Sequence, residues 1–349
     1  MDTVTQMLLG ATVAQAGFRR RLGRRALAVG AAVALLPDLD SIVGWVAGPF
    51  AGWLYHRGLT HSIFFGPLAG LLIGWLVWAW HRRRYGPDSP WVADGALRAW
   101  CGLSILALIT HPIIDVFTHY GTQWLYPLTD TRFAIPAMPI IDPVYSLILI
   151  AAIGVGLVVR RRAQLAQDTA AVALLLVAAY TLGGWAMNSR VESVARAQLG
   201  PSANVSAYPT LFQPFLRRVV VEQPDAIWIG FHSVLSQRDI VWQRFERNSS
   251  PAIEAVAATR RAQIFDWFAM ERVYWRQQRL DDGAVRVQAL DYRYGLPGDS
   301  VLGIWGIQAT VDAHGTRVGP VEQFSPPQDT SAAAWRDFWR RIIGAAPGG

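Results

Sequence analysis

The sequence reads H-P-I-I-D-V-F-T-H from His111 to His119, directly after an apolar, uncharged run from Ala99 to Thr110. His111, Asp115 and His119 are spaced i, i+4 and i+8, so on a helix they lie along one face. The preceding run is apolar enough to lie in lipid, where ionisable side chains are costly to leave without partners. The stretch therefore predicts a membrane helix that ends in a cluster of metal-type ligands.

Two other stretches offer the same chemistry. One is P-D-L-D from Pro37 to Asp40, and the other is H-R-G-L-T-H-S from His56 to Ser62. Imidazole and carboxylate together suit zinc, manganese, iron or nickel. We predict that these stretches converge with the first on one metal site at one face of a membrane.

The composition indicates an integral membrane protein. Of 349 residues, 52% are hydrophobic and only 16% are charged, and several apolar runs approach the ~20 residues that span a bilayer. All 32 basic residues are arginine, and they cluster beside apolar runs, which indicates membrane topology rather than nucleic-acid binding. The single cysteine, Cys101, excludes an intramolecular disulfide and a cysteine-based zinc motif. The N-terminus lacks the pattern of a secretory signal, so we expect it to belong to the mature protein.

The predicted fold is mainly α: a polytopic transmembrane helical bundle over residues 1–188 and a C-terminal extramembrane α+β domain over residues 189–349. The apolar segments of the bundle are Thr3–Phe18, Ala26–Leu36, Ile63–Trp80, Ala99–Phe117, Pro139–Val159 and Thr169–Met187. The first two are short and resemble a helical hairpin, and Ser41–Tyr55 is a Gly/Trp-rich connection suited to the membrane interface. The expected strands of the C-terminal domain, rich in β-branched and aromatic residues, are Leu216–Val221, Ala226–Val234, Val273–Arg279, Val285–Tyr294 and Gly303–Asp312. Ser250–Met270 and Ser331–Ile343 have helical character, the second amphipathic and suited either to core packing or to a membrane surface.

The arginine clusters at 19–25, 82–84 and 160–162 orient the bundle, because positively charged loops face the cytoplasm. Tracing the spans from these anchors places the C-terminal domain outside. The same tracing places all the candidate ligands toward the outer face, namely Asp2, Asp38, Asp40, His56, His61, His111, Asp115, His119 and Asp142.

Purely structural roles for these residues remain open. Asp38 and Asp40 could cap a helix, and His111, Asp115 and His119 could form a buried polar network. The remaining histidines lie outside the three stretches and are expected to be structural: His81, His232 and His314.

The chain resembles the YdjM-like family of membrane-bound metal-dependent hydrolases. The N-terminal bundle carries most of the resemblance, in the opening Met1-Asp2, the segment T-Q-M-L-L-G-A from Thr5 to Ala11, and the three stretches above. Looser matches follow at Tyr120-Gly121-Thr122, Asp142-Pro143, Pro209-Thr210, Pro214-Phe215 and Arg217–Val220. The family often has histidine where this sequence has Gln6, which would weaken or replace one coordination. The resemblance implies a multi-pass protein of the bacterial inner membrane and a hydrolytic activity.

We therefore expect a membrane hydrolase that uses one or two divalent metals, zinc first and manganese or another metal as alternatives, at the outer face. The substrate would be a phosphoester or other ester of a lipid-linked or amphiphilic molecule, and no nucleic-acid partner is expected. The expected metal ligands are His56, His61, His111 and Asp115, supported by Asp2, His119 and Asp142. The expected catalytic residues are Asp38 and Asp40, as base or ligands, and Arg57 or Arg132, which would hold an anionic substrate group. The rivals are a transport or metal-handling protein and a non-catalytic envelope scaffold.

Overall fold

The computed structural model describes the whole chain except residues 160–161, 298–300, 314–317 and 346–349. Arg160, Arg161 and His314, which entered the sequence predictions, lie outside the described residues. The chain forms two compact units. The first, here called the helical unit, comprises Met1–Val46 and Tyr55–Gly183, and the second, here called the β-rich unit, comprises Ala47–Leu54 and Gly184–Gly349.

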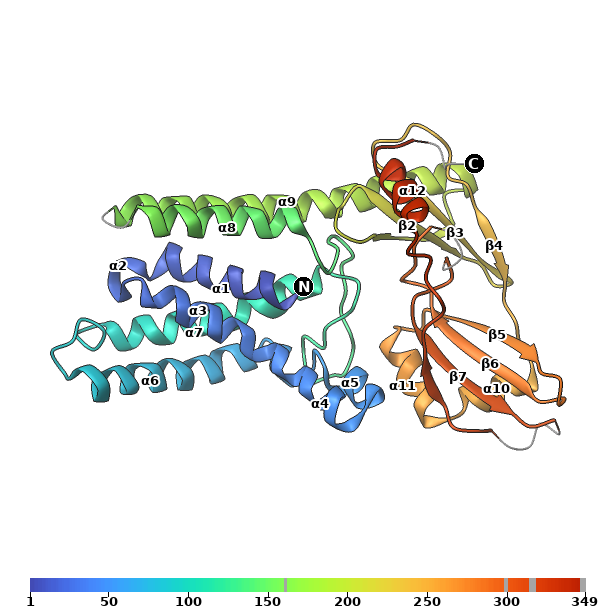
Figure 1. Ribbon diagram of the computed structural model, residues 1–349, viewed down its shortest axis with the longest axis horizontal. Helices are drawn as coiled ribbons and strands as arrows, with labels where there is room; N and C mark the ends of the chain where they lie inside the picture. The colour runs from blue at the N-terminus through green and yellow to red at the C-terminus, as the bar shows by residue number, and fades with distance from the viewer. Residues whose placement is uncertain (160–161, 298–300, 314–317, 346–349) are drawn as a thin grey trace. The chain divides into compact units, whose positions relative to one another are not determined.

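The helical unit is built around α1 and α7, which contact each other and the other long helices. Helix α1 packs on α3, α7 and α8, and α7 also packs on α3 and α6 (Figure 1). The helices of this unit are α1 (Thr3–Gly17), α2 (Arg19–Leu22), α3 (Arg25–Leu35), η1 (Leu36–Ser41), α4 (Ile42–Ala47), η2 (Leu59–His61), α6 (Phe65–Tyr85), α7 (Ala96–Val116), α8 (Pro143–Val158) and α9 (Ala163–Leu199), the last of which continues into the β-rich unit.

Within the described residues, three helical stretches are long and apolar enough to cross a membrane, which confirms the predicted multi-pass class. They are Arg25–Ala47, Ala96–Val116 and Ala163–Leu199, and the bent pair Pro49–His61 and Phe65–Tyr85 would make a fourth span. One difference concerns the predicted hairpin segment that ends at Leu36. The helical backbone continues there through η1 into α4, because proline fits the first turn of a helix, where no N–H donor is needed.

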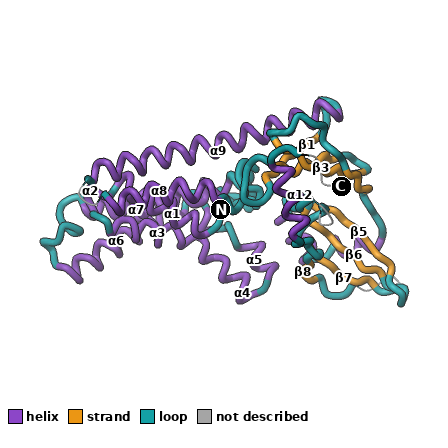
Figure 2. The backbone as a smooth tube through the Cα atoms, turned by 45° about the horizontal axis from the view of Figure 1, so that its top comes forward, coloured by secondary structure: helices purple, strands orange, loops and turns teal. Residues whose placement is uncertain are grey.

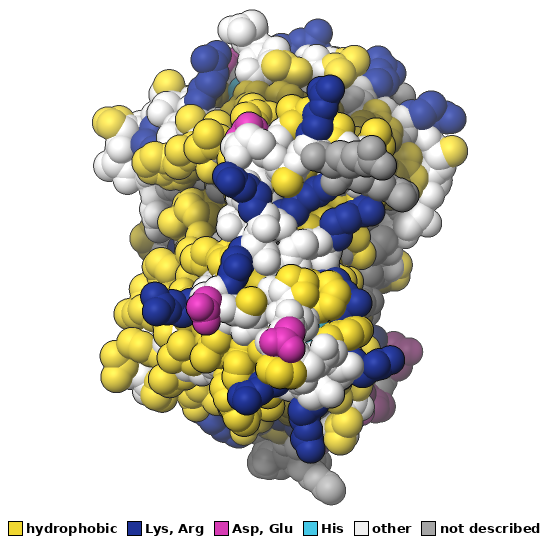
Figure 3. All heavy atoms as spheres, turned by 90° about the vertical axis from the view of Figure 1, so that its left-hand side faces the viewer, with side chains coloured by type: hydrophobic (Ala, Val, Ile, Leu, Met, Phe, Trp, Pro, Cys, Tyr) yellow, Lys and Arg dark blue, Asp and Glu magenta, His cyan; other side chains and the backbone are white. Residues whose placement is uncertain are grey.

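Arginine side chains spread over the end of the helical unit where α2 and the α6–α7 connection lie (Figure 3). Exposed members of this group are Arg20, Arg21, Arg24, Arg82, Arg83 and Arg84. Charges of this kind are excluded from the hydrocarbon core, so this end of the unit is suited to the membrane–water boundary.

Glycine allows α6 and α7 to approach closely. Gly66, Gly70 and Gly74 stand four residues apart along α6, and all three are buried. A Cβ atom at Gly70 would lie 2.7 Å from the Cα of Ile105, and one at Gly74 would lie 2.4 Å from the Cα of Cys101. Such small-residue faces favour helix association in lipid, where apolar side chains gain nothing by leaving their surroundings.

The β-rich unit contains two antiparallel four-stranded sheets, with orders β1-β2-β3-β4 and β5-β6-β7-β8 (Figure 2). The strands are β1 (Asn204–Pro209), β2 (Leu216–Glu222), β3 (Ala226–Ser233), β4 (Gln243–Glu246), β5 (Val273–Arg279), β6 (Val285–Asp291), β7 (Gly306–Val311) and β8 (Glu322–Phe324). The helices are α5 (Pro49–Tyr55), α10 (Pro251–Ala257), α11 (Arg260–Phe268) and α12 (Ala332–Ile342).

Alternate residues of β2 pack into two different cores, as expected for a strand buried on both faces. Val219 and Val221 pack with α9, while Val220 packs with Tyr274 of the second sheet and with Tyr292 and Val301, which follow β6. The segment from Ala47 to Leu54 belongs to this unit because Trp53 stacks on α11. The partners of the Trp53 ring are Phe265 and Phe268, with ring centroids at 5.1 and 5.3 Å.

We expect Gly74→Ala to lower the stability of the helical unit, because the added methyl group meets the α7 backbone. Overpacking of this kind costs about 1–3 kcal/mol. The matched control is Gly154→Ala on α8, where a Cβ atom would meet nothing within 4 Å. Thermal unfolding in detergent should show a lower Tm for the first variant and an unchanged or higher Tm for the second. An equal fall in Tm for both variants would contradict the close approach of α6 and α7.

Candidate metal centre

Helix α7 presents His111 and Asp115 to the interior of the helical unit. They are one turn apart, and both side chains are fully buried. The helix ends at Val116, with Phe117 as its C-cap. His119 is buried in the turn that follows, so it does not continue the ligand face of the helix as its spacing suggested.

The stretch from Pro37 to Asp40 lies in η1, directly after α3. Successive residues of a 3₁₀ helix are about 120° apart, so two residues that differ by two positions point in different directions. Asp38 Oδ1 lies 3.3 Å from His111 Nε2 and 3.6 Å from His61 Nε2, whereas Asp40 faces the other nitrogen of His61. The two carboxylates therefore have separate roles.

Asp40 holds the turn that carries His61. Its Oδ2 accepts hydrogen bonds from the backbone N–H of Arg57 at 3.1 Å and from the hydroxyl of Thr60 at 2.7 Å, and its Oδ1 lies 2.6 Å from His56 Nδ1. Arg57 has φ of 61°, a left-handed conformation that is uncommon outside glycine. The turn leads into η2, which directs His61 inward, where it is fully buried.

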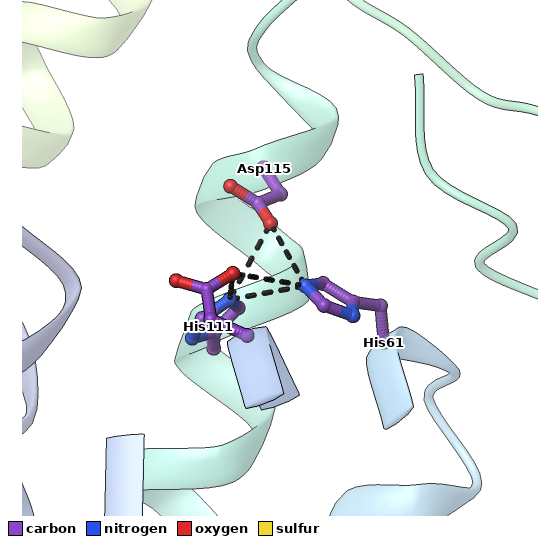
Figure 4. A group of neighbouring side chains, drawn as sticks. His61, His111 and Asp115 are labelled. Carbon is purple, nitrogen blue, oxygen red and sulfur yellow. Dashed lines mark hydrogen bonds and ion pairs between the residues drawn. The ribbon is translucent and has the colours of Figure 1, made fainter. Parts of the chain in front are cut away.

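Four ligand atoms converge at the centre of this arrangement. Asp38, His61, His111 and Asp115 each offer one nitrogen or oxygen, and the four atoms lie within 4.8 Å of one another. The two Nε2 atoms are 3.1 Å apart, and Asp115 Oδ2 lies 3.4 Å from that of His61 and 3.5 Å from that of His111. Figure 4 shows the labelled side chains pointing toward one another, with His111 and Asp115 on one helix and His61 on a separate segment.

The hydrogen bonds on the far side of each imidazole fix its tautomer. His111 Nδ1 lies 2.7 Å from the Ala34 carbonyl, which only accepts, so Nδ1 carries a proton. His61 Nδ1 lies 3.1 Å from Asp40 Oδ2 and 3.1 Å from the Thr60 hydroxyl, whose proton is already donated to Asp40, so this Nδ1 is also protonated. In the neutral form of each ring, Nε2 is then the nitrogen with the lone pair and faces the centre, as in metal-binding histidines.

These four ligand atoms fit a divalent metal. Asp115 Oδ2 is buried without a hydrogen-bond partner. The five separations that involve a histidine nitrogen are 3.1–3.6 Å, close to the edge of a tetrahedron, about 3.3 Å for metal–ligand bonds near 2.0 Å, and the two carboxylate oxygens lie within 4.8 Å of each other. A single proton could bridge only one pair of these atoms, whereas a metal ion would contact all four. The residue types suit zinc or manganese and do not select between them.

The second oxygen of Asp115 is held by separate partners. Oδ1 lies 3.2 Å from Arg57 Nη2 and accepts a hydrogen bond from Gln6 Nε2 at 3.1 Å, and the Met1 amino group also contacts it. Arg57 further donates to Thr118 Oγ1 at 2.9 Å. These contacts orient Asp115 so that Oδ2 faces the centre, which is how outer partners commonly position metal ligands.

The other predicted site residues lie elsewhere in the helical unit. Asp2 caps the N-terminus of α1, and Asp142 caps that of α8 and accepts a hydrogen bond from the Tyr180 hydroxyl. His56 pairs with Asp40 beside the four-residue cluster, and Arg132 donates to the Gly121 carbonyl at 2.7 Å. The structure therefore brings together Asp38, His61, His111 and Asp115, with Asp40, His56 and Arg57 around them.

Some residues that shape the site could not be recognised from the sequence. The Ala34 carbonyl fixes the His111 tautomer through its backbone, which leaves no trace in residue type. Thr60 and Thr118 bond to Asp40 and Arg57, but threonine is too common to be singled out. Gln6 stands where the resembling family often has histidine, and its amide donates to Asp115 Oδ1.

Comparisons with known proteins match mainly the part of the chain that forms the helical unit. The family described as YdjM inner membrane protein matches residues 1–191. Inner membrane protein YbcI of Escherichia coli (strain K12) is 31% identical over 114 residues, which cover 32% of this chain and 59% of the relative. The match thus spans less than two thirds of that relative's length. No solved structure matches the chain.

We expect His61→Ala and His111→Ala to abolish metal binding, because each removes one of the four ligand atoms. The matched control is His81→Ala, which removes another buried histidine, one that bonds the Val77 carbonyl in α6. Metal analysis of purified proteins after zinc or manganese loading should show about one ion per chain in wild type and control. A metal-free wild type, or full metal content in both site variants, would refute the site.

Asp2→Asn and Asp142→Ala test the residues that the structure places at helix N-caps. We expect both variants to keep their metal, because neither carboxylate is among the four ligands. Asp142→Ala should also lower stability by about 1 kcal/mol through loss of the cap. The measurements are metal content and Tm on the same samples. A variant that stays folded but loses its metal would show that the substituted aspartate is a metal ligand.

Proposed function

The chain belongs to the YdjM family of inner membrane proteins, and from this premise we propose that it is a metal-dependent hydrolase centred on Asp38, His61, His111 and Asp115. The proposed substrate is an ester or phosphoester of an amphiphilic, lipid-linked molecule. The proposed metal is zinc, with manganese as the alternative.

One observation carries the proposal. Two imidazole nitrogens and two carboxylate oxygens meet in the interior of an apolar helical unit, and Asp115 Oδ2 has no hydrogen-bond donor. Arg57 and the Met1 amino group compensate Oδ1 of this carboxylate, so a cation at the centre would serve the remaining oxygen, Oδ2, whose burial without a partner is unfavourable. Asp38 is the one member of the cluster whose side chain is partly exposed, at 12%, so in this proposal the substrate reaches the centre from the side of Asp38. An accessible centre suits catalysis better than a purely structural site, which is closed.

When bound, the metal would act as a Lewis acid on the scissile ester and lower the pKa of a water molecule. The chain's own residues supply the remaining functions. Asp40 fixes the orientation of His56 through the 2.6 Å contact at Nδ1, and the His56 side chain is 21% exposed. Its Nε2 atom is therefore suited to carry a proton to the leaving oxygen. Arg57 is committed to Asp115 and Thr118, so in this proposal it positions a ligand instead of holding the substrate.

The site's place in the sequence supports a substrate at the membrane. The ligands lie at the ends of apolar helices, and the arginine clusters lie at the opposite ends of the same segments. By the positive-inside rule this arrangement favours a site at the outer face, within reach of lipid-linked molecules. Among the described residues, one such group of ligand atoms is found, whereas an ion pathway would need further sites along its length.

The proposal is tested by turnover of p-nitrophenyl esters and phosphodiesters, with short and long acyl chains, by the full chain in nanodiscs. We expect activity that is lost with a chelator and restored by zinc or manganese, with a preference for long chains. His56→Gln should lower kcat by about 10²–10⁴-fold, as loss of a proton-transfer group does, while the metal content stays unchanged.

His111→Ala provides the matched comparison, because it should lose metal and turnover together. Activity that survives metal removal in wild type would refute the proposal. Zinc uptake into proteoliposomes without turnover of any ester would indicate metal transport instead of hydrolysis.

A further inference from the structure

Helix α12, which lies against β3 (Figure 1), has a wider apolar face than the β-rich unit covers. Phe338 and Ile342 are buried, at 4% and 7% exposed, and pack with Leu216 of β2. Trp339 and Ile343 each follow one of this pair by one residue and are 51% and 70% exposed. One residue is a rotation of about 100° on a helix, so Trp339 and Ile343 form the outward part of the same apolar face.

Two further apolar side chains extend this surface from the connection between β3 and β4. Leu235 is 54% exposed, and Val241 is 74% exposed. Gly344 joins the two segments, since a Cβ atom there would lie 3.2 Å from the Leu235 carbonyl oxygen, and it lines one cavity together with Val241. We call Leu235, Val241, Trp339 and Ile343 the apolar patch.

The apolar patch holds all the exposed hydrophobic bulk of this part of the protein. Among the described residues that follow α9, its four members are the only large hydrophobic side chains that are exposed. Exposed hydrophobic residues that are scattered singly over a surface are ordinary, whereas a group of them on one face marks an interaction site.

Arginines border the apolar patch. Arg336 and Arg340 each precede one of its α12 members by three residues, so they lie beside Trp339 and Ile343 on the helix surface. Arg238 lines the same cavity as Val241. All three arginines are exposed, and no ion pair holds any of them in the part of the chain that the structure describes.

The acidic residues near these arginines already have partners. Asp337 Oδ2 lies 2.6 Å from Arg341 Nε, and Asp239 Oδ1 accepts a hydrogen bond from Gln198 Nε2 at 2.8 Å. The border of the apolar patch is therefore positively charged. Its charge suits a partner that combines an apolar interior with anionic groups at its surface.

We propose that the apolar patch and its arginines bind the surface of an anionic phospholipid bilayer, with α12 in the headgroup region. Tryptophan and arginine are typical of amphipathic helices that lie in this region. The chain belongs to a family of inner membrane proteins, so its own bilayer is within reach at high effective concentration. A second copy of the chain fits less well, because it would present the same positive charge. The proposal does not depend on the metal centre or on hydrolysis.

The test follows an NBD fluorophore at residue 343, attached through Ile343→Cys in a Cys101→Ser background, since Cys101 is the only native cysteine. The full chain is reconstituted in nanodiscs of phosphatidylcholine, alone or mixed with phosphatidylglycerol, with and without a nitroxide quencher on the acyl chains. We expect blue-shifted emission and quenching that is about twofold or more stronger in the anionic discs. The same label at Asp281→Cys, in an exposed turn of the second sheet, controls for the affinity of the fluorophore itself and should not be quenched.

Two pairs of arginine variants test the role of charge. Arg336→Gln combined with Arg340→Gln should lower the ratio of bound to free patch by about tenfold, because each arginine near an anionic surface adds to the binding. The matched control, Arg279→Gln combined with Arg286→Gln on β5 and β6, makes the same change in net charge and should leave the quenching unchanged. All four side chains are exposed, so the Tm should stay near that of wild type.

Three results would overturn the proposal. The first is a label at residue 343 that lipid quenches in neither kind of disc. The second is blue-shifted emission without lipid quenching, which would show that protein, such as a second copy of the chain, covers the apolar patch. The third is equal quenching with and without phosphatidylglycerol, which would show that the arginines do not recognise anionic lipid.

Discussion

The helical unit depends on an electrostatic imbalance at its centre. Four acceptor atoms from Asp38, His61, His111 and Asp115 face one point, and the hydrogen bonds on the far sides of both rings keep the Nε2 atoms available. In a low-dielectric interior such a cluster is stabilised by a positive charge among its members. The surroundings supply cationic and amide donors to Asp115 Oδ1 but none to Oδ2. The surroundings therefore neutralise one side of this carboxylate and leave the other side facing the three remaining ligand-type atoms of the cluster.

Two rigid features keep that geometry from relaxing. The glycine face of α6 brings its backbone against α7, which leaves little freedom for the helix that carries His111 and Asp115. The left-handed residue Arg57 fixes the turn before His61, and its side chain returns to Asp115. One residue thus shapes a ligand-bearing turn and orients a ligand on another element. Strain at a residue with two such roles is typical of functional sites.

The sequence predicts the kind of site, a cluster of histidine and aspartate side chains, better than it predicts which of these residues meet. The i, i+4 spacing of His111 and Asp115 is a direct consequence of helix geometry, and it was sufficient to place them on one face. The choice of Asp38 over Asp40 and of His61 over His56 depends on the 3₁₀ turn and on the φ of Arg57. Neither feature has a residue-type signature at these positions. In the β-rich unit the apolar strands β2, β3, β5, β6 and β7 were predicted, whereas the short or polar strands β1, β4 and β8 were not, because their pattern is that of a loop.

The path of the chain between Asp40 and His56 cannot be read from the spacing of these residues in the sequence. The backbone leaves the helical unit after Val46 and re-enters it at Tyr55, and the residues between belong to the β-rich unit through the stack of Trp53 on α11. Asp40 therefore precedes this excursion, and His56 follows it directly. Closing the loop between Asp40 and His56 costs conformational entropy, and the 2.6 Å contact between their side chains is one of the interactions that offset this cost.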